Sequence, residues 1–596
     1  MNWKNRSYCG QISNQLTHQE IQVYGWVDTI RDHGQVLFIH LRDVSGVVQV
    51  VFDPLIDQSS YAISQTLKPE YVISIQGKVR DRSEETKNPQ LTNGDIEIIA
   101  SKLEILNTAE TPPFSISEKE GASQTVDEEV RLTYRYLDLR RPLMQQNMIN
   151  RFKILNLFRE YLTARNFIEV ETPTLTKSTP EGARDYLVPS RIHPDHFYAL
   201  PQSPQLFKQL LMIAGMDRYF QVAKCFRDED LRPNRQPEFT QLDLEASFID
   251  ESFIYELIEG IIPKVFAIQG IAMTTPFPHM TYTDAMNRFG SDAPDLRFGL
   301  EMIDVTDVFA NTNYKIFRGV LDAKGIIKGF NISGKADVLT KNLLQNEWAL
   351  EVIPKLGGKG MTWMKMTEEG LQSNIVQFFS EAEQHQLIER MNAKIGDVLI
   401  FVADPSARKV NDLLGRFRLF VAESLQLIPE NTWNAVWITD FPLFEKKQGK
   451  IESVHHPFTQ AQQDLLALQS EAEILSVKAR AYDLVINGQE VGGGSIRNHD
   501  VKVQKRMFEI LGLNDEQIKE KFGFFIEAFQ YGAPPHGGLA LGIDRLVSMI
   551  LNTPSIREVI AFPKNRVATC PMSQAPSPVE LEQLQDLHLK VIKNLS

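Results

Sequence analysis

The sequence predicts a multidomain α+β protein, in which a small all-β domain precedes a larger domain of mixed helices and strands. The 596 residues are too many for a single hydrophobic core. The first hundred residues contain short runs rich in β-branched side chains, and the remainder mixes helical spacing with further strands. Hydrophobic residues make up 43% of the chain and charged residues 23%, as in an ordinary globular protein.

Composition excludes several kinds of protein. No apolar run approaches the ~20 residues that a membrane-spanning helix needs, and the N-terminus lacks the pattern of a secretory signal. The cysteines Cys9, Cys225 and Cys570 lie far apart in the sequence and form neither a metal-ligand spacing nor a disulfide framework. We therefore expect a cytoplasmic protein with no membrane partner.

Charge is a further constraint. The net charge of −13 indicates that nucleic acid is not held by bulk positive charge, so any contact with RNA needs a local basic patch. One candidate patch, which a solvated charged surface explains equally well, consists of Arg131, Arg135, Arg140 and Arg141.

Turn residues divide the N-terminal part of the chain into short strands. Residues 47–52, 71–75 and 96–99 are rich in β-branched and aromatic side chains, with turn signals between them. Several short strands without a long helix predict a small barrel or sandwich. The polar, proline-containing stretch that follows, 108–129, is typical of a linker.

Helical spacing begins near residue 150, where apolar side chains recur at helical intervals over 150–166. The stretch from about 295 to 429 has strands and helices of its own but lacks the polar motifs of its flanks, which predicts an inserted domain. A last amphipathic helix is expected over 578–593. Its apolar face would consist of Leu581, Leu584, Leu587 and Val591.

The most informative segment is 226–245, whose two arms predict antiparallel strands joined by a charged loop. The second arm alternates polar with apolar residues, so Gln241, Asp243 and Glu245 would share one face of a strand. Such a face could hold a polyphosphate nucleotide, because the planar fork of an arginine suits an α-phosphate. The alternative is a salt-bridged surface hairpin, which would have no need of so many polar groups on one face.

Two glycine-rich segments carry further polar groups. In 483–497 three glycines would let a ligand approach the backbone, while Asp483 and Glu490 could hold Mg²⁺ and Arg497 could receive a carboxylate. In 537–546 a glycine-rich strand leads into a helix, so a purine could lie on the strand and Arg545 could reach a γ-phosphate. Taken alone, the first segment could be a simple hairpin and the second a buried strand with a helix start.

A fourth segment, 165–173, predicts the end of a helix and a strand that leads to Pro173, and architecture alone explains most of its residues. Together, however, the four segments resemble the class II aminoacyl-tRNA synthetases in order and spacing. Segment 165–173 is similar to motif 1, which implies a homodimer. The segment that begins at Phe226 is similar to motif 2, and 538–545 is similar to motif 3.

Further segments sharpen this resemblance to the bacterial aspartyl-tRNA synthetases of subclass IIb, and it covers essentially the whole chain. These segments are 178–186, 202–209, 455–459 and 491–497, together with Gly25-Trp26-Val27 and Arg42-Asp43. The resemblance implies an OB-fold anticodon-binding β-barrel and a catalytic domain built on an antiparallel sheet, with an inserted, GAD-like α/β domain between motifs 2 and 3. The implied ranges are 1–107 for the OB-fold, 108–135 for a hinge, 136–290 and 430–562 for the catalytic domain, 291–429 for the insertion and 563–596 for a C-terminal extension.

The resemblance implies a ligase that activates L-aspartate with ATP to aspartyl-adenylate and transfers aspartate to the 3′ end of tRNA(Asp), with Mg²⁺ as cofactor. The substrate carboxylate would attack the α-phosphorus, so catalysis needs positioning and charge neutralisation but no protein nucleophile. Two cations facing the substrate side chain would explain the choice of acid over amide, because asparagine would leave both cations desolvated and unpaired.

Carried over residue by residue, the resemblance assigns three groups of contacts, with Arg227 and Arg545 as the catalytic pair. Aspartate would be bound by Glu181 on a closing loop, Ser203, Gln205, Lys208, Arg227, Asp243, His455 and Arg497. ATP would be bound by Arg227, Asp228, Glu229, Gln236, Glu490, Gly542, Ile543, Asp544 and Arg545. Mg²⁺ would be held by Asp483 and Glu490. His455 could act as a general base or simply contact the substrate.

In the N-terminal domain the resemblance places Arg31, Phe38 and Gln49 against the anticodon loop, although a strand phenylalanine is more often part of a core. Two further positions bear on the choice of tRNA. His33 tends to accompany relaxed enzymes that charge both tRNA(Asp) and tRNA(Asn), whereas Glu85 stands where such enzymes often have glycine. The two indications conflict, and we expect that tRNA(Asn) is charged as well as tRNA(Asp). The alternative is that His33 is an ordinary polar loop residue.

Three alternative functions are open. The enzyme could be strictly specific for tRNA(Asp), it could load an acceptor other than tRNA, or it could be an inactive RNA-binding relative. The N-terminal strands argue against a non-tRNA acceptor. Retention of Arg227, Glu229, Asp483, Glu490 and Arg545 argues against an inactive protein.

Overall fold

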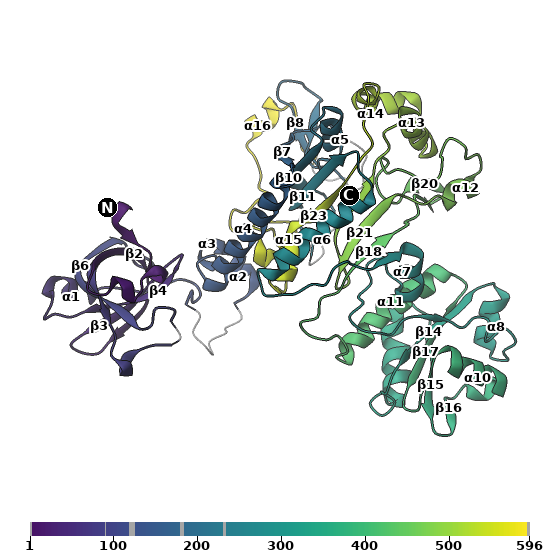
Figure 1. Ribbon diagram of the computed structural model, residues 1–596, viewed down its shortest axis with the longest axis horizontal. Helices are drawn as coiled ribbons and strands as arrows, with labels where there is room; N and C mark the ends of the chain where they lie inside the picture. Colours follow the sequence, from purple (N-terminus) through teal and green to yellow (C-terminus); the bar gives the residue numbers. More distant parts are fainter. Residues whose placement is uncertain (1–2, 90, 118–125, 179–183, 230–233, 593–596) are drawn as a thin grey trace. The chain divides into compact units, whose positions relative to one another are not determined.

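The computed structural model describes residues 3–89, 91–117, 126–178, 184–229 and 234–592. These residues divide into two compact units, Met1–Phe152 with Arg557–Pro578, and Lys153–Ile556 with Val579–Ser596 (Figure 1). Over the part of the chain that is described, no helix is both long and apolar enough to cross a membrane.

The first unit begins with a β-barrel. Its strands are paired in the order β1-β2-β3-β4-β6-β5, and a further pairing of β2 with β5 closes the barrel. The helix α1 (Gln58–Ser64) lies between β4 and β5. Along β3 the side chains of Leu37, Ile39 and Leu41 are buried in the barrel, while Phe38 points outward. The predicted barrel or sandwich is thus a closed barrel, which confirms the OB-fold. The strands are β1 (Arg6–Ser7), β2 (Glu20–Asp32), β3 (Leu37–Asp43), β4 (Gly46–Phe52), β5 (Val72–Asp81) and β6 (Ile96–Asn107).

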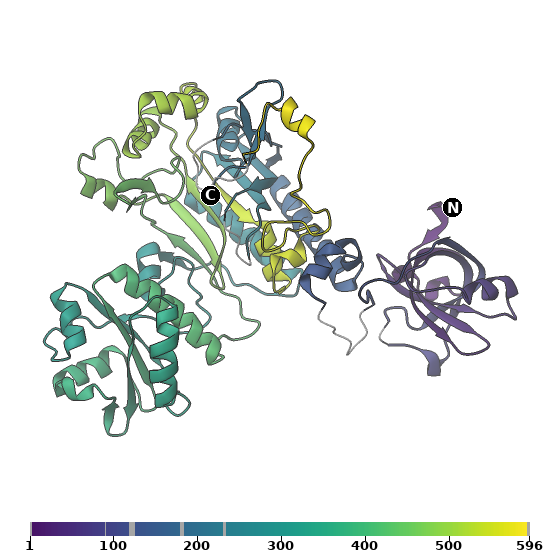
Figure 2. The ribbon, with the colours of Figure 1, turned by 180° about the vertical axis from the view of Figure 1, so that it is seen from behind.

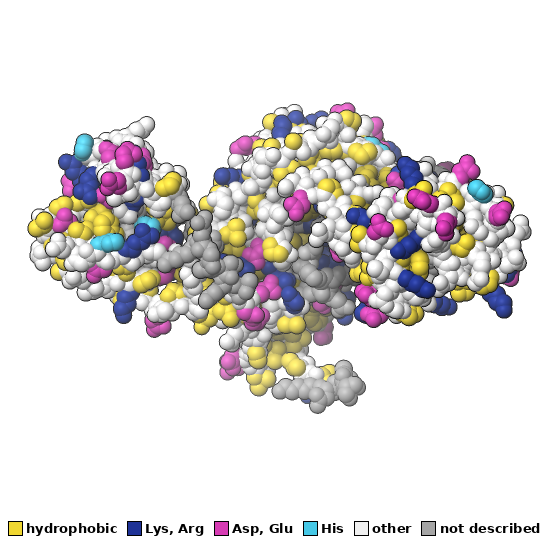
Figure 3. Space-filling view, turned by 90° about the horizontal axis from the view of Figure 1, so that it is seen from below, with side chains coloured by type: hydrophobic (Ala, Val, Ile, Leu, Met, Phe, Trp, Pro, Cys, Tyr) yellow, Lys and Arg dark blue, Asp and Glu magenta, His cyan; other side chains and the backbone are white. Residues whose placement is uncertain are grey.

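The four arginines considered as an RNA-binding patch lie on the helices α2 (Glu128–Thr133) and α3 (Arg135–Asp138) or just after them. Arg135 is only 2% exposed and donates hydrogen bonds to the backbone carbonyls of residues 557, 560 and 561. Intramolecular partners thus hold these guanidinium groups, while the side chains of Arg131, Arg140 and Arg141 stay partly exposed, and the RNA patch stays a prediction. Two carboxylates accept hydrogen bonds from these arginines. Asp138 accepts from Arg131, Arg135 and Arg141, and Glu70 accepts from Arg140. On the face shown in Figure 3, basic and acidic side chains are interspersed.

The second unit is organised around an eight-stranded sheet in the order β12-β18-β21-β22-β23-β11-β10-β7. All interior pairings are antiparallel, and the two edge strands β12 and β7 pair in parallel. This confirms the predicted antiparallel catalytic sheet. The strands are β7 (Ile168–Glu169), β10 (Arg218–Phe226), β11 (Glu238–Ser247), β12 (His279–Thr281), β18 (Ala435–Thr439), β21 (Ala481–Ile486), β22 (Gln489–Ile496) and β23 (His536–Gly542).

Apolar helices cover one face of this sheet and leave polar side chains on the other. The helices α6 (Glu251–Ala267) and α15 (Ile543–Ile550) contact β23, and α15 also contacts β11, as Figure 1 shows. Alternation along β11 buries Leu242 and Leu244 and turns Asp243 and Glu245 to the opposite face. A second cluster joins α5 (Gln205–Ile213), α13 (Val501–Ile510) and α14 (Asp515–Phe529) through Phe508, Phe522 and Phe525.

Residues 303–404 contain a second sheet with the order β13-β14-β17-β15-β16, whose strands are all antiparallel. One apolar cluster packs α11 (Ala407–Ser424) against the sheet, and another lies under α8 (Lys315–Asp322) and α10 (Glu381–Arg390), so helices flank it on both sides (Figures 1 and 2). The strands are β13 (Ile303–Asp304), β14 (Ile326–Ile332), β15 (Thr362–Thr367), β16 (Gly370–Gln372) and β17 (Val398–Asp404). Other helices are α7 (Tyr282–Phe289), η5 (Leu343–Val352) and α9 (Ile353–Lys355).

Two helix predictions differ from the structure in extent. The helix expected over 150–166 is α4 (Pro142–Thr163), which starts earlier because proline is well suited to the first helical turn. The expected C-terminal helix over 578–593 is only α16 (Leu581–Asp586). It ends because His588 has a φ of 56°, and its expected apolar face is not buried, since Leu581 is 68% exposed and Val591 62%.

Candidate active site

Three cavities meet on the polar face of the eight-stranded sheet. Their volumes are about 200, 960 and 750 Å³, and the side chain of Arg227 lines all three. Arg227 occupies this position because it directly follows β10, where the antiparallel pair β10–β11 opens into its connecting loop. We call the three spaces the nucleotide cavity, the amino-acid cavity and the third cavity, in the order of the volumes given.

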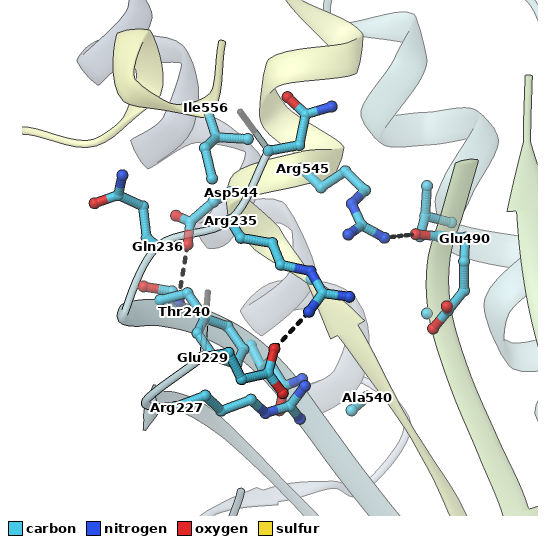
Figure 4. A pocket seen from close by; sticks show the side chains of 16 residues that line it. Arg227, Glu229, Arg235, Gln236, Thr240, Glu490, Ala540, Asp544, Arg545 and Ile556 are labelled. Carbon is cyan, nitrogen blue, oxygen red and sulfur yellow. Dashed lines mark hydrogen bonds and ion pairs between the residues drawn. The ribbon is translucent and has the colours of Figure 1, made fainter. Parts of the chain in front are cut away.

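The nucleotide cavity lies between the start of β11 and the start of α15 (Figure 4). The guanidinium of Arg227 lies 5.1 Å from the ring centroid of Phe239, which fixes its plane. Arg235 forms an ion pair with Glu229, and Arg545 donates a hydrogen bond to the backbone oxygen of Glu490. Of the residues expected to bind ATP, those that line this cavity are Arg227, Glu229, Gln236, Glu490, Gly542, Asp544 and Arg545.

Two of the expected ATP contacts do not line this cavity. Ile543 is completely buried at the start of α15, and Asp228 faces Arg184, whose Nε lies 3.9 Å from its carboxylate. Asp544 lines the cavity, but its carboxylate accepts a hydrogen bond of 2.8 Å from the backbone N–H of Thr240. Asp544 therefore ties α15 to β11, which positions the neighbouring Arg545.

The amino-acid cavity contains a cluster of buried charges. Lys208, on α5, lies 3.0 Å from Asp243 and 3.2 Å from Glu245. Arg497, just after β22, donates two hydrogen bonds to the two oxygens of Glu245, at 2.9 and 3.1 Å. Each of these side chains is at most 2% exposed. The structure thus brings Lys208, Arg497 and Arg227 around one cavity, as the aspartate-site hypothesis requires.

This cluster corrects the expectation that Lys208 and Arg497 are left without partners unless a substrate carboxylate is present. Both are already paired with protein carboxylates. Lys208 pairs with Asp243 and Glu245, and Arg497 pairs with Glu245, so this end of the cavity holds two cations and two carboxylates. The sequence motifs assign no role to Glu245. The sequence does indicate that Glu245 lies near the site, because it follows Asp243 by two residues and therefore lies on the same face of the strand.

The ionisation of the two acids follows from their surroundings. Burial raises the pKa of Glu245, but Arg497 and Lys208 outweigh burial and lower the pKa to about 2. For Asp243 burial has the larger effect, so its pKa lies above the ordinary value despite the nearby Lys208. Glu245 is therefore the permanent counter-ion of the cluster.

Two histidines border the cluster. The ring of His455 lies 4.7 Å from that of Phe441, and its Nε2 has no hydrogen-bond partner among the described residues. Burial and the charge of Arg497 lower the pKa of His455 to about 4. Nε2 of His456 accepts a hydrogen bond of 2.5 Å from Arg497, and burial lowers its pKa well below the ordinary value. Both rings are neutral at pH 7, so His455 is a weak base. The hydrogen bond from Arg497 to His456 is a contact that the sequence motifs do not indicate.

We expect stability to fall as the pH falls from 6.5 to about 4, in part because of His455. In that window the unfolded chain protonates this histidine and the folded protein does not, so the unfolded state binds more protons. In urea unfolding, His455→Gln should remove about 1–3 kcal/mol of the stability difference between pH 7 and pH 4.5. His385→Gln, on the exposed surface of α10, is the matched control. An unchanged pH dependence in His455→Gln would contradict the assignment.

Glycines in β22 and β23 make room for buried carboxylates. A Cβ atom on Gly538 would lie 2.0 Å from Oε2 of Glu245, and one on Gly493 would lie 2.3 Å from Oδ1 of Asp483. We expected these glycines to admit a ligand, whereas at these two positions the neighbour is an acidic side chain of the protein itself. The glycines therefore act indirectly, by fixing the charged groups of the site.

Gly538→Ala should displace Glu245 and the neighbouring backbone, because the added Cβ would lie 2.0 Å from Oε2 of Glu245 and 2.1 Å from the carbonyl oxygen of Leu244. We expect a loss of about 1–3 kcal/mol in the free energy of unfolding, because the added methyl group has no space, together with a strong loss of activity. Gly299→Ala, where a Cβ meets nothing within 4 Å, is the control. Urea unfolding of the two variants provides the measurement, and equal stability would contradict the close packing of Gly538 against Glu245 and Leu244.

Asp483 and Glu490 come from neighbouring strands and both line the amino-acid cavity. Burial, together with the negative charges of Glu490 and Asp292, raises the pKa of Asp483 well above its ordinary value. Within the described residues, no three His, Cys, Asp or Glu side chains are arranged as a metal site. Two carboxylates suit Mg²⁺, which usually takes one or two carboxylates and completes its shell with phosphates and water.

The remaining expected aspartate contacts fall into two groups. Ser203 and Gln205, at the start of α5, line the amino-acid cavity, and the amide nitrogen of Gln205 has no hydrogen-bond partner among the described residues. Glu181 lies outside the described residues.

The barrel of the first unit gathers the expected anticodon contacts on its outer face. Phe38 is paired in register with Arg31, and its neighbour His40 is paired with Gln49, so these side chains share one face. Phe38 is half-buried, and the ring of His33 meets it edge-on with 5.4 Å between centroids. Glu85 lies on the exposed turn η4 (Glu84–Thr86). Phe38 is therefore a surface aromatic and not part of the barrel core.

Comparison with protein families gives two matches. A family described as class II tRNA synthetases (D, K and N) matches residues 127–566. A family described as an OB-fold nucleic acid binding domain matches residues 21–106.

Curated relatives are similar over nearly the full chain. A protein named aspartate–tRNA(Asp/Asn) ligase 1 from Syntrophus aciditrophicus is 57% identical, with 99% of this chain and 83% of the relative covered. A protein named aspartate–tRNA(Asp/Asn) ligase from Natranaerobius thermophilus is 48% identical, with 99% and 100% covered. A protein of the same name from Aquifex aeolicus is 47% identical, with 99% of each chain covered.

A solved structure shares the fold. Asparaginyl-tRNA synthetase from Pyrococcus horikoshii, complexed with asparaginyl-adenylate, aligns with a TM-score of 0.57 and 19% identity, covering 94% of this chain and 97% of that one. At this identity the match bears on the fold alone.

Proposed function

The chain belongs to the class II tRNA synthetases of the D, K and N group and is an aspartate–tRNA ligase, and we propose that Arg227 organises both of its reaction steps. The observation that carries the proposal is the convergence of Arg227, Lys208 and Arg497 on one cavity that adjoins the nucleotide cavity. ATP and L-aspartate are the substrates of the first step, and tRNA is the acceptor of the second.

In the first step ATP would occupy the nucleotide cavity. Its α-phosphate would lie at Arg227 and its γ-phosphate at Arg545, which bracket the cavity (Figure 4). Aspartate would direct its side-chain carboxylate to Lys208 and Arg497 and its α-carboxylate to Arg227, so that the α-carboxylate and the α-phosphorus meet. Arg227 would then neutralise the charge that builds up on the α-phosphate as pyrophosphate leaves.

Asp483 and Glu490 would hold Mg²⁺, which when bound would offset the negative charge of the phosphates. The raised pKa of Asp483 supports this proposal, because the site gathers negative charge that a cation would relieve.

The two buried cations Lys208 and Arg497, which line the amino-acid cavity, support the choice of acid over amide. Aspartate would bring one further negative charge to the side-chain end of the cavity, whereas asparagine would bring a neutral amide. An amide has one acceptor oxygen and one N–H₂ donor, so it would satisfy the N–H donors of Lys208 and Arg497 less completely than a carboxylate, whose two oxygens both accept.

In the second step a 3′-terminal hydroxyl of tRNA would attack the carbonyl carbon of aspartyl-adenylate. The new ester bond forms as the bond between carbonyl carbon and phosphate oxygen breaks, and AMP leaves with the bonding electrons. Because His455 has a pKa of about 4, we assign it substrate contact and not proton abstraction.

Measurements of aspartate-dependent ATP–pyrophosphate exchange and of aminoacylation test this function together. We expect both activities with purified tRNA(Asp). Exchange without aminoacylation of any tRNA would favour an acceptor other than tRNA, and the absence of exchange would overturn the proposed site.

We further propose that the enzyme charges tRNA(Asn) as well as tRNA(Asp). Two features support this: the relatives named above carry tRNA(Asp/Asn) in their names, and His33 lies beside Phe38 on the outer face of the barrel. Glu85 remains the contrary indication. Aminoacylation of both tRNAs side by side decides between dual and strict specificity. If tRNA(Asn) is charged no more with the enzyme than without it, dual charging is rejected.

The anticodon assignment gives a separate prediction. In Phe38→Ala, kcat/KM for tRNA should fall by roughly 10- to 100-fold, because a stacking platform for one base is lost, while exchange stays at the wild-type rate. Leu55→Ala, at a loop residue of the same unit that is 94% exposed, should change neither activity. Normal charging by Phe38→Ala would contradict a stacking role.

The homodimer and the cytoplasmic location stay predictions. For the dimer, the supporting features are the edge strand β7 with Ile168 50% exposed and, close by in sequence, Leu175 at 51%. For the location, the support is that Cys9, Cys225 and Cys570 are free thiols.

A further inference from the structure

Gln241 lies at the junction of the nucleotide and amino-acid cavities but has no part in the function proposed above, on which the following inference rests. Among the described residues, those that line both cavities are Arg227, Gln241, Glu490 and Ala540. Two of these are charged and Ala540 is apolar, so Gln241 supplies the neutral hydrogen-bonding side chain of the junction. In the proposed reaction, this junction is where aspartate is joined to the α-phosphate and where AMP later leaves.

The sheet leaves room for the side chain of Gln241 on its polar face. Gln241 lies on β11, where its partner on β10 is Ala223 and its partner on β23 is Gly542. Neither partner has a side chain large enough to cover the glutamine, which is only half-buried. The amide of Gln241 can therefore reach its diagonal neighbour across the strand pair, Cys225, which lies two residues beyond Ala223 on the same face.

Cys225 determines which way this amide faces. Its thiol donates a hydrogen bond of 3.3 Å to Oε1 of Gln241. Cys225 is completely buried and lines none of the three cavities. Burial, together with the negative charge of Asp243, raises the pKa of the thiol to about 12, so the thiol keeps its proton and stays a donor. A permanent donor selects the oxygen of the amide and not its N–H₂ group.

The other end of the amide is left for a ligand. The hydrogen bond from Cys225 is the one that the side chain of Gln241 makes among the described residues. The oxygen and the nitrogen of an amide diverge from one carbon atom, so holding Oε1 at Cys225 turns the N–H₂ group away from the thiol and towards the cavity junction. A neutral N–H donor at this place suits an oxygen that gains negative charge during the reaction.

We propose that the amide N–H of Gln241 donates a hydrogen bond to the carbonyl oxygen of aspartyl-adenylate during the transfer step, and that Cys225 is the positioning residue that keeps the amide in this orientation. As the ribose hydroxyl of tRNA attacks the carbonyl carbon, the π electrons of the C=O bond move to that oxygen. The hydrogen bond stabilises this oxyanion until the C=O bond forms again and the bond to the phosphate oxygen breaks. AMP leaves with the bonding electrons, and its phosphate takes the proton of the hydroxyl.

The same hydrogen bond contributes less to the first step. There the oxygen belongs to the attacking carboxylate, and it loses negative charge as the second carboxylate oxygen bonds to the α-phosphorus and pyrophosphate leaves. A donor that binds the ground state at least as well as the transition state does not raise the rate of that step. Activation and transfer should therefore respond differently to the loss of Gln241, which distinguishes this role from a general role in substrate binding.

The test compares the rates of the two steps in the full-length enzyme. Transfer is measured in a single turnover, by mixing enzyme-bound aspartyl-adenylate with saturating tRNA(Asp), and activation is measured as ATP–pyrophosphate exchange. In Gln241→Met, which keeps the length of the side chain but lacks the N–H, the transfer rate should fall about 100-fold. For exchange, kcat should fall by less than about tenfold, and KM for aspartate and for ATP should stay within about threefold of wild type.

A pair of variants tests the role of Cys225. In Cys225→Ala the amide loses its anchor, so the transfer rate should fall by about 3- to 10-fold, as expected for the loss of one hydrogen bond. Cys225→Ser keeps a donor and should hold transfer within about twofold of wild type. The matched control is Val222→Ala. Val222 is half-buried on the same strand but faces the other side of the sheet, so both rates should be unchanged.

Several results would overturn the proposal. Transfer at the wild-type rate in Gln241→Met would exclude the hydrogen bond to the oxyanion, and an equal loss of exchange and transfer would mean that Gln241 only holds the substrates. Equal transfer rates in Cys225→Ser and Cys225→Ala would exclude the anchoring role of the thiol. If Gln241→Met does not fold, the same comparison is made with Gln241→Glu, which keeps the shape of the side chain without its N–H donor. Absence of exchange in the wild-type enzyme would instead refute the proposed function itself.

Discussion

In Arg227→Ala, kcat/KM for aspartate-dependent ATP–pyrophosphate exchange should fall by roughly 10³-fold. Arg227 lies where the nucleotide and amino-acid cavities join, and no other cation lines both of them among the described residues. Removing it takes away the groups that neutralise the developing charge on the α-phosphate and hold the attacking carboxylate. Because its guanidinium is stacked over Phe239 and lines open cavities, the fold should be retained.

Arg416→Ala provides the comparison for this prediction, since Arg416 is a half-exposed arginine of α11 paired with Asp412. It should show normal exchange. Circular dichroism and urea unfolding should be alike for wild type and both variants. Exchange in Arg227→Ala within tenfold of wild type would refute the central role given to this residue.

Arg497→Met should be strongly destabilising as well as inactive. It leaves the completely buried Glu245 with Lys208 as its remaining cation, a situation that costs about 3–5 kcal/mol of unfolding free energy. In the absence of Arg497 the pKa of Glu245 should rise from about 2, so the loss of stability should be greatest at neutral pH, where the carboxylate is charged.

A second variant separates stability from function. In Arg497→Met/Glu245→Gln the uncompensated charge is gone, so much of the lost stability should return, while aspartate-dependent exchange should remain absent because the carboxylate clamp is incomplete. Urea unfolding at pH 7 and exchange assays on both variants provide the measurements. Recovery of exchange in the double variant would show that Arg497 serves only to balance Glu245.

The alternation of polar and apolar residues along 238–247 predicts both the strand β11 and the face that carries Asp243 and Glu245, because side-chain direction in a strand follows directly from sequence order. The pairing of β21 with β22 also follows from sequence order, since only Asn487 and Gly488 separate the two strands. The C-terminal helix shows the limit of this reasoning. Its spacing is helical, but Leu581 is 68% exposed, so little burial stabilises the helix, and α16 ends early.

By itself the sequence predicted a small β domain followed by a domain of mixed strands and helices, and the resemblance of its motifs to a known family implied the arginines, acids and glycines of an aspartate–tRNA ligase. Only the tertiary structure decided how these charges are balanced. Glu245 serves both Lys208 and Arg497 although it is 37 and 252 residues away from them, and Gly538, on another strand, provides the space for its carboxylate. Burial makes such pairings obligatory, because a charge removed from water must find its partner wherever the fold brings one.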